Sequence, residues 1–467
     1  MESLARPFFW RIIFHVAPAP NSSIQARALA AKICLKLSER GFQAYFVGGC
    51  VRDLLLGREP ADYDVATDAT PLQVAELFPG GVLVGAQFGV VIVIEHGHQV
   101  EVATFRSDVG YSDGRHPDQV IFAKTPQEDV ARRDFTIDGM MMNPATGEVL
   151  DFAGGQRDLR AGIIRAIGDP QQRFSEDRLR LLRAIRFAAR FGYGIEIRTL
   201  LAIQQLAPQV TTVSAERLRD ELTKMLTEGA AHRAFALLHE TRLLVPALPE
   251  VALLKGVQQP PEYHPEGDVW LHTLLMLEKL NELPAHARTM TLAWGVLLHD
   301  IGKPATFRSA AETGDRIRFD GHAEVGVRIA EEICRRLRFS NEATEQVMSL
   351  VANHMRFKDV QNMRESTLKR FVRLPGFEEH LALHRLDCLS SHGNLENWEY
   401  VRSFIANTPA EEVRPARLIT GDDLLEMGFI PGPEFKTILQ LVEDAQLEGQ
   451  LKTREEALEY VRKVSGH

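Results

Sequence analysis

The spacing of apolar residues changes once along this chain, and that change limits the possible folds more than any other feature. From Gln43 to about Asp151, short apolar runs such as GVVIVIEHG and QVEVATF are separated by glycine turns, as in β-strands. From about Gln156 the spacing becomes helical, as in DRLRLLRAIRFAARFGY, and it stays helical toward the C-terminus. The sequence therefore predicts an α+β protein: a mixed sheet with helices comes first, and all-α domains follow.

The length of the chain predicts several domains. A chain of 467 residues is too long for one compact core. Proline-bearing breaks between Leu244 and Gly267 predict a linker between two helical units. The predicted parts are an N-terminal extension with a first helix (1–42), a head (43–155), a helical neck (156–250), a second helical domain (262–392) and a helical tail (393–467).

Composition argues against a membrane or exported protein. No segment approaches the roughly 20 apolar residues of a spanning helix. The apolar start, Pro7 to Pro20, is interrupted by Arg11 and His15, unlike a signal peptide. The four cysteines are scattered without a CxxC pair, which favours reduced thiols. We expect a cytoplasmic protein.

Charge indicates that any nucleic-acid surface is local. The net charge of −9 gives no general attraction for nucleic acid. The segment from Arg157 to Arg190, however, holds nine arginines against four acidic residues. A nucleic-acid surface would have to involve such a segment.

The stretch FVGGCVRDLLLGREPADYDVATDATP begins with a pattern suited to phosphate. Gly48 and Gly49 end an apolar strand, and Arg52 follows at the start of an expected helix. Glycines let a backbone approach phosphate oxygens, and helix N–H groups and a guanidinium attract the same anion. A tight strand-to-helix turn without a ligand is the alternative.

Two carboxylates later in the same stretch are suited to metal. Asp62 and Asp64 flank Tyr63. In an extended segment, residues two apart point to the same side, so both carboxylates can hold Mg²⁺. Two such ions can stabilise the attacking and leaving oxygens of phosphoryl transfer. A solvated turn is the alternative, but the position after GGxVRD makes the metal site more specific.

These motifs in this order resemble a known family. GGCVRDLLLG followed by DYD is similar to the head of the class II tRNA nucleotidyltransferases and bacterial poly(A) polymerases, in the DNA polymerase β-like superfamily. The resemblance implies a polymerase β-like head, a neck that binds RNA, and two Mg²⁺ ions. It also implies a third carboxylate in an apolar-acid-apolar pattern, which Glu101 fits; a solvent-exposed glutamate on an edge strand is the alternative.

Two further motifs resemble the same family. RRDFTIDGMMMNP is similar to the family's RRDFTINA, which implies that Arg133 contacts nucleotide phosphates. Asp138 and Gly139 replace the usual Asn-Ala. FSEDRLRLLRAIRFAARFGY is similar to the family's EDxxR motif and places Asp177 and Arg180 in register.

The EDxxR segment also predicts how a base could be selected. We expect a helix with Ser175 as its N-cap and with Asp177 and Arg180 on one face. Cytosine N4 and adenine N6 donate hydrogen bonds that a carboxylate accepts, whereas guanine and uracil offer a carbonyl there. The family resemblance also implies that Arg183 and Arg186 reach the nucleotide or its phosphates. A solvated, salt-bridged helix face is the alternative.

Histidines and aspartates of the second helical domain form another pattern. HPEGDVWLHT, LLHDIGKP and a later aspartate match the H...HD...D order of HD phosphohydrolases, and imidazole with carboxylate suits a divalent transition metal that activates water. His322 and His354 could complete a second metal position. The expected ligands are His272, His299, Asp300 and Asp387.

The resemblance therefore implies an enzyme that adds CCA, or part of it, to tRNA 3′ ends from CTP and ATP. Some family members carry an HD domain with phosphatase or cyclic phosphodiesterase activity. A poly(A) polymerase is the nearest rival, but that subfamily typically has an arginine-rich segment where this chain has LVGAQFGVVIV. An HD phosphohydrolase whose head only binds nucleotide or RNA is the other rival. CC-only enzymes of the resembled family tend to lack part of the loop FRSDVGYSDGRHPD, so its presence here disfavours CC-only addition. The oligomeric state stays open.

Overall fold

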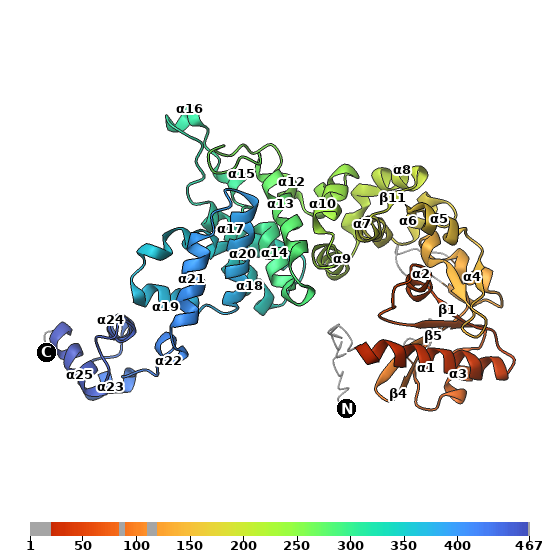
Figure 1. The fold of residues 1–467 in the computed structure, drawn as a ribbon, viewed down its shortest axis with the longest axis horizontal. Helices are drawn as coiled ribbons and strands as arrows, with labels where there is room; N and C mark the ends of the chain where they lie inside the picture. The colour runs from red at the N-terminus through yellow and green to blue at the C-terminus, as the bar shows by residue number, and fades with distance from the viewer. Residues whose placement is uncertain (1–19, 84–88, 110–118, 466–467) are drawn as a thin grey trace, which may run out of the picture. The chain divides into compact units, whose positions relative to one another are not determined.

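The computed structural model describes residues 20–83, 89–109 and 119–465, which form two compact units that divide between Val213 and Ser214 (Figure 1). Each unit is described by itself. The beginning of the predicted N-terminal extension and part of the loop FRSDVGYSDGRHPD lie outside the described residues.

A seven-stranded mixed sheet forms the head in the first unit and confirms the predicted α+β class. The strand order is β3-β4-β5-β2-β1-β8-β9, and β2 pairs in parallel with β5 while its other neighbour, β1, is antiparallel. Val65 and Ala66 are both fully buried. Successive strand residues point to opposite faces, so both faces are covered at β2. Helix α1 packs against β1, β2 and β5. The elements are α1 (Pro20–Glu39), β1 (Ala44–Val47), α2 (Gly49–Leu55), β2 (Asp64–Thr67), α3 (Pro71–Leu77), β3 (Val82–Leu83), β4 (Val90–Glu95), β5 (His98–Thr104), β6 (Arg106–Val109), β7 (Gln119–Phe122), α4 (Pro126–Ala131), η2 (Thr136–Asp138), β8 (Met140–Met142), β9 (Val149–Asp151) and α5 (Gly155–Ala161).

The helical part of the first unit differs from the predicted EDxxR helix. The chain forms two helices there, because α6 ends at Glu176 and α7 begins at Leu179. Ser175 lies inside α6, so its prediction as an N-cap was wrong. Asp177 is extended, with φ −146° and ψ 107°, which breaks the helix. The elements are β10 (Ile163–Ile164), α6 (Pro170–Glu176), α7 (Leu179–Phe191), β11 (Gly194–Ile195), α8 (Ile197–Leu206) and η3 (Ala207–Thr212).

The second unit begins inside the predicted neck. Helix α9 packs against α14, where Trp294 is fully buried and its indole Nε1 donates to Thr223 Oγ1 at 2.9 Å. The predicted linker is folded in its first half, because α11 and α12 occupy it and Leu248, Val251 and Leu254 are fully buried. Proline at the first turn of α12 begins a helix there instead of interrupting one.

The second domain and the tail are helical, as predicted. Gly302 allows a close approach, because a Cβ on it would lie 2.1 Å from the carbonyl oxygen of His322. The elements are α9 (Ala215–Thr227), α10 (Ala231–Glu240), α11 (Leu244–Ala247), α12 (Pro249–Ala252), α13 (Val269–Glu282), η4 (Ala285–Ala287), α14 (Met290–Leu298), α15 (Lys303–Thr306), α16 (Ala310–Thr313), α17 (His322–Arg336), α18 (Asn341–Asn353), η5 (His354–Asn362), α19 (Glu365–Val372), α20 (Phe377–Ser390), α21 (Glu396–Asn407), α22 (Ala410–Val413), α23 (Gly421–Glu426), α24 (Pro433–Leu447) and α25 (Arg454–Ser465).

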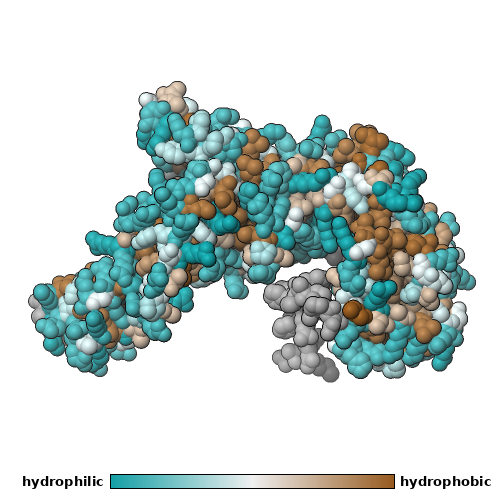
Figure 2. Space-filling model, viewed as in Figure 1, coloured by the Kyte–Doolittle hydropathy of each residue, from teal (hydrophilic) through white to brown (hydrophobic). Residues whose placement is uncertain are grey.

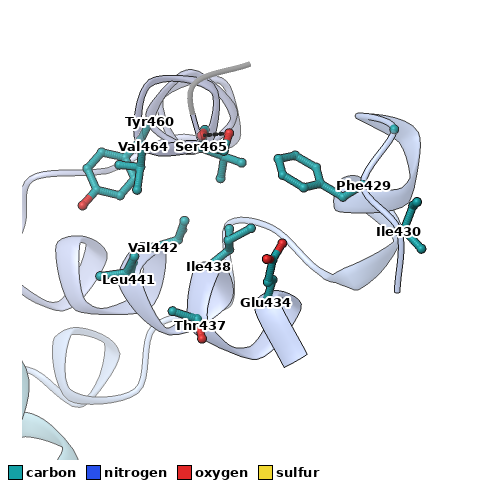
Figure 3. Close-up of a pocket in the computed structure, with 12 residues that line it drawn as sticks. Phe429, Ile430, Glu434, Thr437, Ile438, Leu441, Val442, Tyr460, Val464 and Ser465 are labelled. Carbon is teal, nitrogen blue, oxygen red and sulfur yellow. Dashed lines mark hydrogen bonds between the residues drawn. The ribbon is translucent and has the colours of Figure 1, made fainter. Parts of the chain in front are cut away.

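The tail has a small core of its own and an apolar pocket. Leu424, Val442 and Val461 are among the buried residues that α23, α24 and α25 contribute. A pocket of about 680 Å³ lies between α24, α25 and the segment that follows α23, with Ile438 and Tyr460 in its wall (Figure 3). Hydrophilic residues cover most of the face shown in Figure 2, with apolar side chains in scattered groups. Within the described ranges, none of the helices combines the length and apolar character needed to cross a bilayer.

Candidate functional site

Three carboxylates gather at one end of the head sheet. Asp64 is the first residue of β2, and its direct partner on the parallel strand β5 is Glu101. Asp62 lies two residues before Asp64, and all three side chains are exposed. The intervening Tyr63 is 2% exposed and packs edge-on against Phe46, so it points to the buried side. Strand β5 lies between β4 and β2, so the edge-strand interpretation of Glu101 was wrong.

The electrostatics of this group favour a bound cation. Desolvation by the surrounding protein, together with the charges of Glu101 and Asp62, raises the pKa of Asp64 to about 7, although the charge of Arg133 opposes the shift. Neighbouring carboxylates repel one another when all are ionised, and a divalent cation between them removes that repulsion. Oxygen ligands of this kind are those that Mg²⁺ prefers, so the donor set fits the predicted ion.

The double glycine turn lies beside two guanidinium groups. Gly48 has φ 71° and ψ −133°, a conformation that favours glycine, and α2 begins at the next residue. A Cβ on Gly48 would lie 3.5 Å from Arg133 Nη1, and one on Gly49 would lie 3.3 Å from Arg52 Nη2. The structure therefore brings together the four residues predicted to hold a triphosphate.

Each of these arginines is anchored by carboxylates. Arg133 donates from Nε and Nη2 to Asp129 Oδ2 at 3.2 and 2.9 Å. Arg52, which is 5% exposed, donates from Nε to Asp53 at 2.9 Å and from Nη1 to Asp138 at 2.5 Å. Sequence reasoning missed Asp129, and it noted Asp138 only as a departure from Asn.

A further arginine-carboxylate pair lies close to Arg52 and Asp138. Arg183 Nε donates to Asp134 Oδ2 at 2.7 Å. Burial alone would raise the pKa of Asp134, but the charge and hydrogen bond of Arg183 lower it. Burial raises the pKa of Asp138 despite the nearby charge of Arg52, and the charge of Asp134 contributes to that rise. The two carboxylates and the two arginines thus form one network of neighbouring charges.

Aromatic rings of α7 support the same network. The guanidinium carbon of Arg52 lies 4.6 Å from the ring centre of Phe191, and that of Arg183 lies 5.2 Å from Phe187. The guanidinium carbon of Arg186 lies 4.5 Å from the Phe187 ring centre, and Arg186 is buried; its predicted reach toward the nucleotide stays a prediction. Cation–ring contacts of this kind hold a guanidinium plane in place.

The predicted base-reading pair is placed differently from the expectation. Asp177 Oδ1 accepts from the backbone N–H of Leu179 at 3.1 Å, in the break between α6 and α7. Arg180 Nη1 donates to Glu176 Oε2 at 2.8 Å, and its Nη2 donates to the carbonyl oxygen of Arg132 at 3.1 Å. The two residues therefore do not share one helix face, and Arg180 is the one that contacts the RRD segment that carries Arg133.

The predicted metal ligands of the second unit converge on one centre. His272 Nε2 lies 3.2 Å from Asp387 Oδ1, and His299 Nε2 lies 3.1 Å from Asp300 Oδ2. The other oxygen, Asp300 Oδ1, lies 3.6 Å from His322 Nε2 and 3.7 Å from His354 Nε2. Asp300 thus belongs to two groups of possible ligands, one with His272 and His299 and one with His322 and His354.

The imidazoles of this centre are oriented as metal ligands require. Nδ1 of His299, His322 and His354 lies 2.7 to 2.9 Å from a backbone carbonyl oxygen. His272 Nδ1 lies 2.7 Å from Glu266 Oε1. These contacts leave each Nε2 available to the centre. Among the described residues, the buried Nε2 atoms of His272 and His299 have no well-aligned hydrogen-bond partner, although a carboxylate oxygen lies within 3.2 Å of each, so this donor set fits a divalent transition metal.

Residues that sequence reasoning missed complete the surroundings. Lys303 Nζ lies 2.7 Å from Asp300 Oδ2. Burial alone would raise the pKa of Asp300, but the charges of His299 and Lys303 hold it well below its usual value. A pocket of about 730 Å³ opens onto the centre, and Arg316 and Lys358 contribute positive charge to its wall. Their only sequence signal was a basic residue near each histidine motif.

Models of four known protein families match successive parts of this chain, and the last two overlap. The head domain of poly(A) polymerases matches residues 44–165, and a probable RNA and SrmB binding site of polymerase A matches residues 192–254. An HD domain matches residues 269–376, and a putative second domain of tRNA nucleotidyltransferases matches residues 323–461.

Individual relatives are similar over most of the chain. The CCA-adding enzyme of Leuconostoc mesenteroides is 32% identical over 92% of this chain and 94% of its own length, and that of a Geobacillus species is 31% identical over 92% and 95%. The crystal structure of the Bacillus stearothermophilus CCA-adding enzyme in complex with CTP is similar with a TM-score of 0.72 and 26% identity, over 96% of this chain and 98% of that one.

Proposed function

Because this chain belongs to the CCA-adding enzymes, a family of nucleotidyltransferases, we propose that it builds tRNA 3′ ends from CTP and ATP at Asp62, Asp64 and Glu101. The observation that carries the assignment is the register of β2 and β5, which sets Asp64 opposite Glu101 beside the glycine turn. The relatives favour this reaction over a poly(A) polymerase and over a head that only binds nucleotide.

The carboxylates are suited to holding two Mg²⁺ ions. Bound there, the ions would favour ionisation of the terminal 3′-hydroxyl of tRNA and neutralise the departing pyrophosphate. Asp64 would supply a carboxylate ligand to these ions, together with its neighbours Asp62 and Glu101. Release of its proton accompanies metal binding, because the ion favours the charged form of the carboxylate.

The glycine turn and the anchored arginines hold the triphosphate. Gly48 and Gly49 let the backbone approach the phosphates, and Arg52 and Arg133 each direct one guanidinium nitrogen toward the turn. Both arginines are already held by carboxylates, so little side-chain freedom remains to be lost when nucleotide binds.

Asp177 and Arg180 select the base in this proposal, with Arg183 beside them. The carboxylate of Asp177 accepts from the exocyclic amino group of cytosine or adenine, and the guanidinium of Arg180 donates to acceptors on the same edge. This selection requires Arg180 to exchange its present contacts with Glu176 and the Arg132 carbonyl for contacts with the base.

Incorporation by the purified protein tests this function. The substrates are tRNAs that lack three, two or one of the terminal nucleotides, each incubated with one labelled nucleotide and Mg²⁺. We expect C on the two shorter tRNAs and A on the longest. Long A tails would instead indicate a poly(A) polymerase, and C alone or A alone a partial enzyme. No incorporation would leave only a binding head.

The second unit supports an additional hydrolytic activity toward phosphate esters. The assignment rests on the Nε2 atoms of His272 and His299, which are buried and have no well-aligned hydrogen-bond partner among the described residues. A divalent transition metal held with Asp300 and Asp387 would activate water for attack on phosphorus. Metal analysis and phosphatase and cyclic phosphodiesterase assays test it. A metal-free wild-type protein without hydrolysis would rule the activity out, and His299→Ala serves as the comparison.

We also infer a cytoplasmic location. The four cysteines are all free and buried in the structure, as expected for thiols that stay reduced.

A further inference from the structure

We propose that Asp138 is a positioning residue for the triphosphate site and that it acts through Arg52. The inference rests on the proposed function, because it assigns a part in phosphate binding to a position where the family resemblance implies only a part in sugar recognition. In the resembled motif RRDFTINA, an asparagine stands at this position.

The guanidinium of Arg52 is held in a defined orientation. All three of its nitrogens have a defined direction: Nε donates to Asp53, Nη1 donates to Asp138, and Nη2 lies beside Gly49. Two carboxylates thus hold two corners of a rigid planar group. The third corner is consequently directed toward the turn where phosphate is expected.

Removal of Asp138 would leave the Arg52 guanidinium without one of its two anchors. Arg52 is 5% exposed and one face of its guanidinium lies over Phe191, which offers no hydrogen-bond acceptor in the ring plane. Without Asp138, Nη1 would be a buried donor without its charged partner. The side chain would turn to recover one, and Nη2 would leave the position beside Gly49.

Arg133 is anchored in the same way as Arg52. This arginine also has two nitrogens held by a carboxylate, that of Asp129, while Nη1 lies beside Gly48. The same arrangement thus occurs on both sides of the double glycine. Two independent carboxylate anchors that direct nitrogens to adjacent glycines indicate a function in binding the anion, since protein stability alone requires no common target.

Aspartate and asparagine at position 138 would differ in how strongly they hold Arg52. An asparagine side-chain oxygen can accept one hydrogen bond from Nη1, but it carries no charge. In this chain the contact is charge-assisted and therefore stronger. Asp138→Asn should thus retain part of the positioning, and Asp138→Ala should retain none.

The experiment measures the KM for CTP and for ATP and the inhibition constant of pyrophosphate in the incorporation assay. For Asp138→Ala we expect all three to rise by about 10-fold, with a smaller effect on kcat. Asp138→Asn should raise them by about 3-fold at most. Asp68→Ala is the matched control, because Asp68 accepts from the Gln43 backbone N–H away from the arginines; its constants should match the wild type.

A double-mutant cycle with Arg52→Lys separates positioning from folding stability. If Asp138 acts through Arg52, adding Asp138→Asn or Asp138→Ala to Arg52→Lys should change the KM by less than about 2-fold. Independent, multiplicative effects would overturn the proposal, and so would unchanged constants in Asp138→Ala. If the alanine variant does not fold, the asparagine cycle decides alone.

Two further outcomes identify competing roles. A rise confined to ribonucleotides and absent for deoxynucleotides would overturn the proposal in favour of sugar recognition. A rise for only one of CTP and ATP would overturn it in favour of base selection. Incorporation of C and A by the wild type tests the proposed function separately, so failure of a variant prediction leaves that function intact.

Discussion

Asp64 and Glu101 lie directly opposite each other on the parallel strands β2 and β5. We expect Asp64→Asn to lower kcat for incorporation by about 1000-fold and Glu101→Gln by about 100-fold, because each removes charge that holds the metal ions. The double variant should be little slower than Asp64→Asn, since the groups act as a unit. Single-turnover incorporation measures this. A Glu101→Gln variant as fast as the wild type would remove Glu101 from the site.

Asp177 provides a prediction about base choice. Asp177→Asn replaces an acceptor oxygen with an amide that also donates, so the exclusion of UTP should weaken by about 10- to 100-fold relative to CTP. The measurement is the ratio of kcat/KM for CTP and UTP on a tRNA that lacks all three terminal nucleotides. Asp169→Asn, at the N-cap of α6, is the control and should leave the ratio unchanged. An unchanged ratio in Asp177→Asn would place base selection elsewhere.

Asp300 is shared between two groups of possible ligands, and this sharing predicts metal stoichiometry. If each group holds one ion, Asp300→Asn should lose both ions from the second unit, and His272→Ala or His322→Ala should each lose one of the two. Elemental analysis after dialysis measures the content per chain. Incorporation of C and A should continue in all three variants. Retention of full metal content by Asp300→Asn would contradict the shared position.

His380 predicts an acid-sensitive contribution to stability. It is 1% exposed, and burial lowers its pKa from 6.5 to about 4. The unfolded chain therefore binds a proton first as pH falls, so the contribution is complete above about pH 6.5 and is lost between 6.5 and 4. This shift corresponds to about 3 kcal/mol.

Thermal unfolding at pH 7.5 and pH 5 checks the His380 prediction. The melting temperature of the wild type should fall more between these two values than that of His380→Gln, which cannot titrate. His286→Gln is the control, because His286 is exposed, and it should behave like the wild type. Equal falls in wild type and His380→Gln would contradict the prediction.

The local patterns were predictable from the sequence because they depend on neighbours in the chain. The spacing of Gly48, Gly49 and Arg52 identified the start of α2, and the pattern around Glu101 placed it in a strand. The change from strand to helix near Gln156 is also local, and the two short strands β10 and β11 are the exceptions after it.

Features that depend on distant residues were not predictable. The pairing of Arg52 with Asp138 joins residues 86 positions apart, which come together where β1 pairs with β8 and α2 packs against η2. The break at Asp177 was missed because helical spacing runs through both α6 and α7. The first half of the predicted linker is buried because its leucines pack within the second unit, which its prolines alone do not reveal.

The packing of Trp294 against Thr223 bears on how such a protein can be inherited and rearranged. A gene fusion or recombination within residues 255–268 would separate α14 from α9 and expose a fully buried tryptophan together with its hydrogen-bonding partner. An exchange between Val213 and Ser214 would keep that interface intact. Descendants that gain or lose the domain that holds His272, His299 and Asp300 should therefore carry α9 with it, as one heritable module.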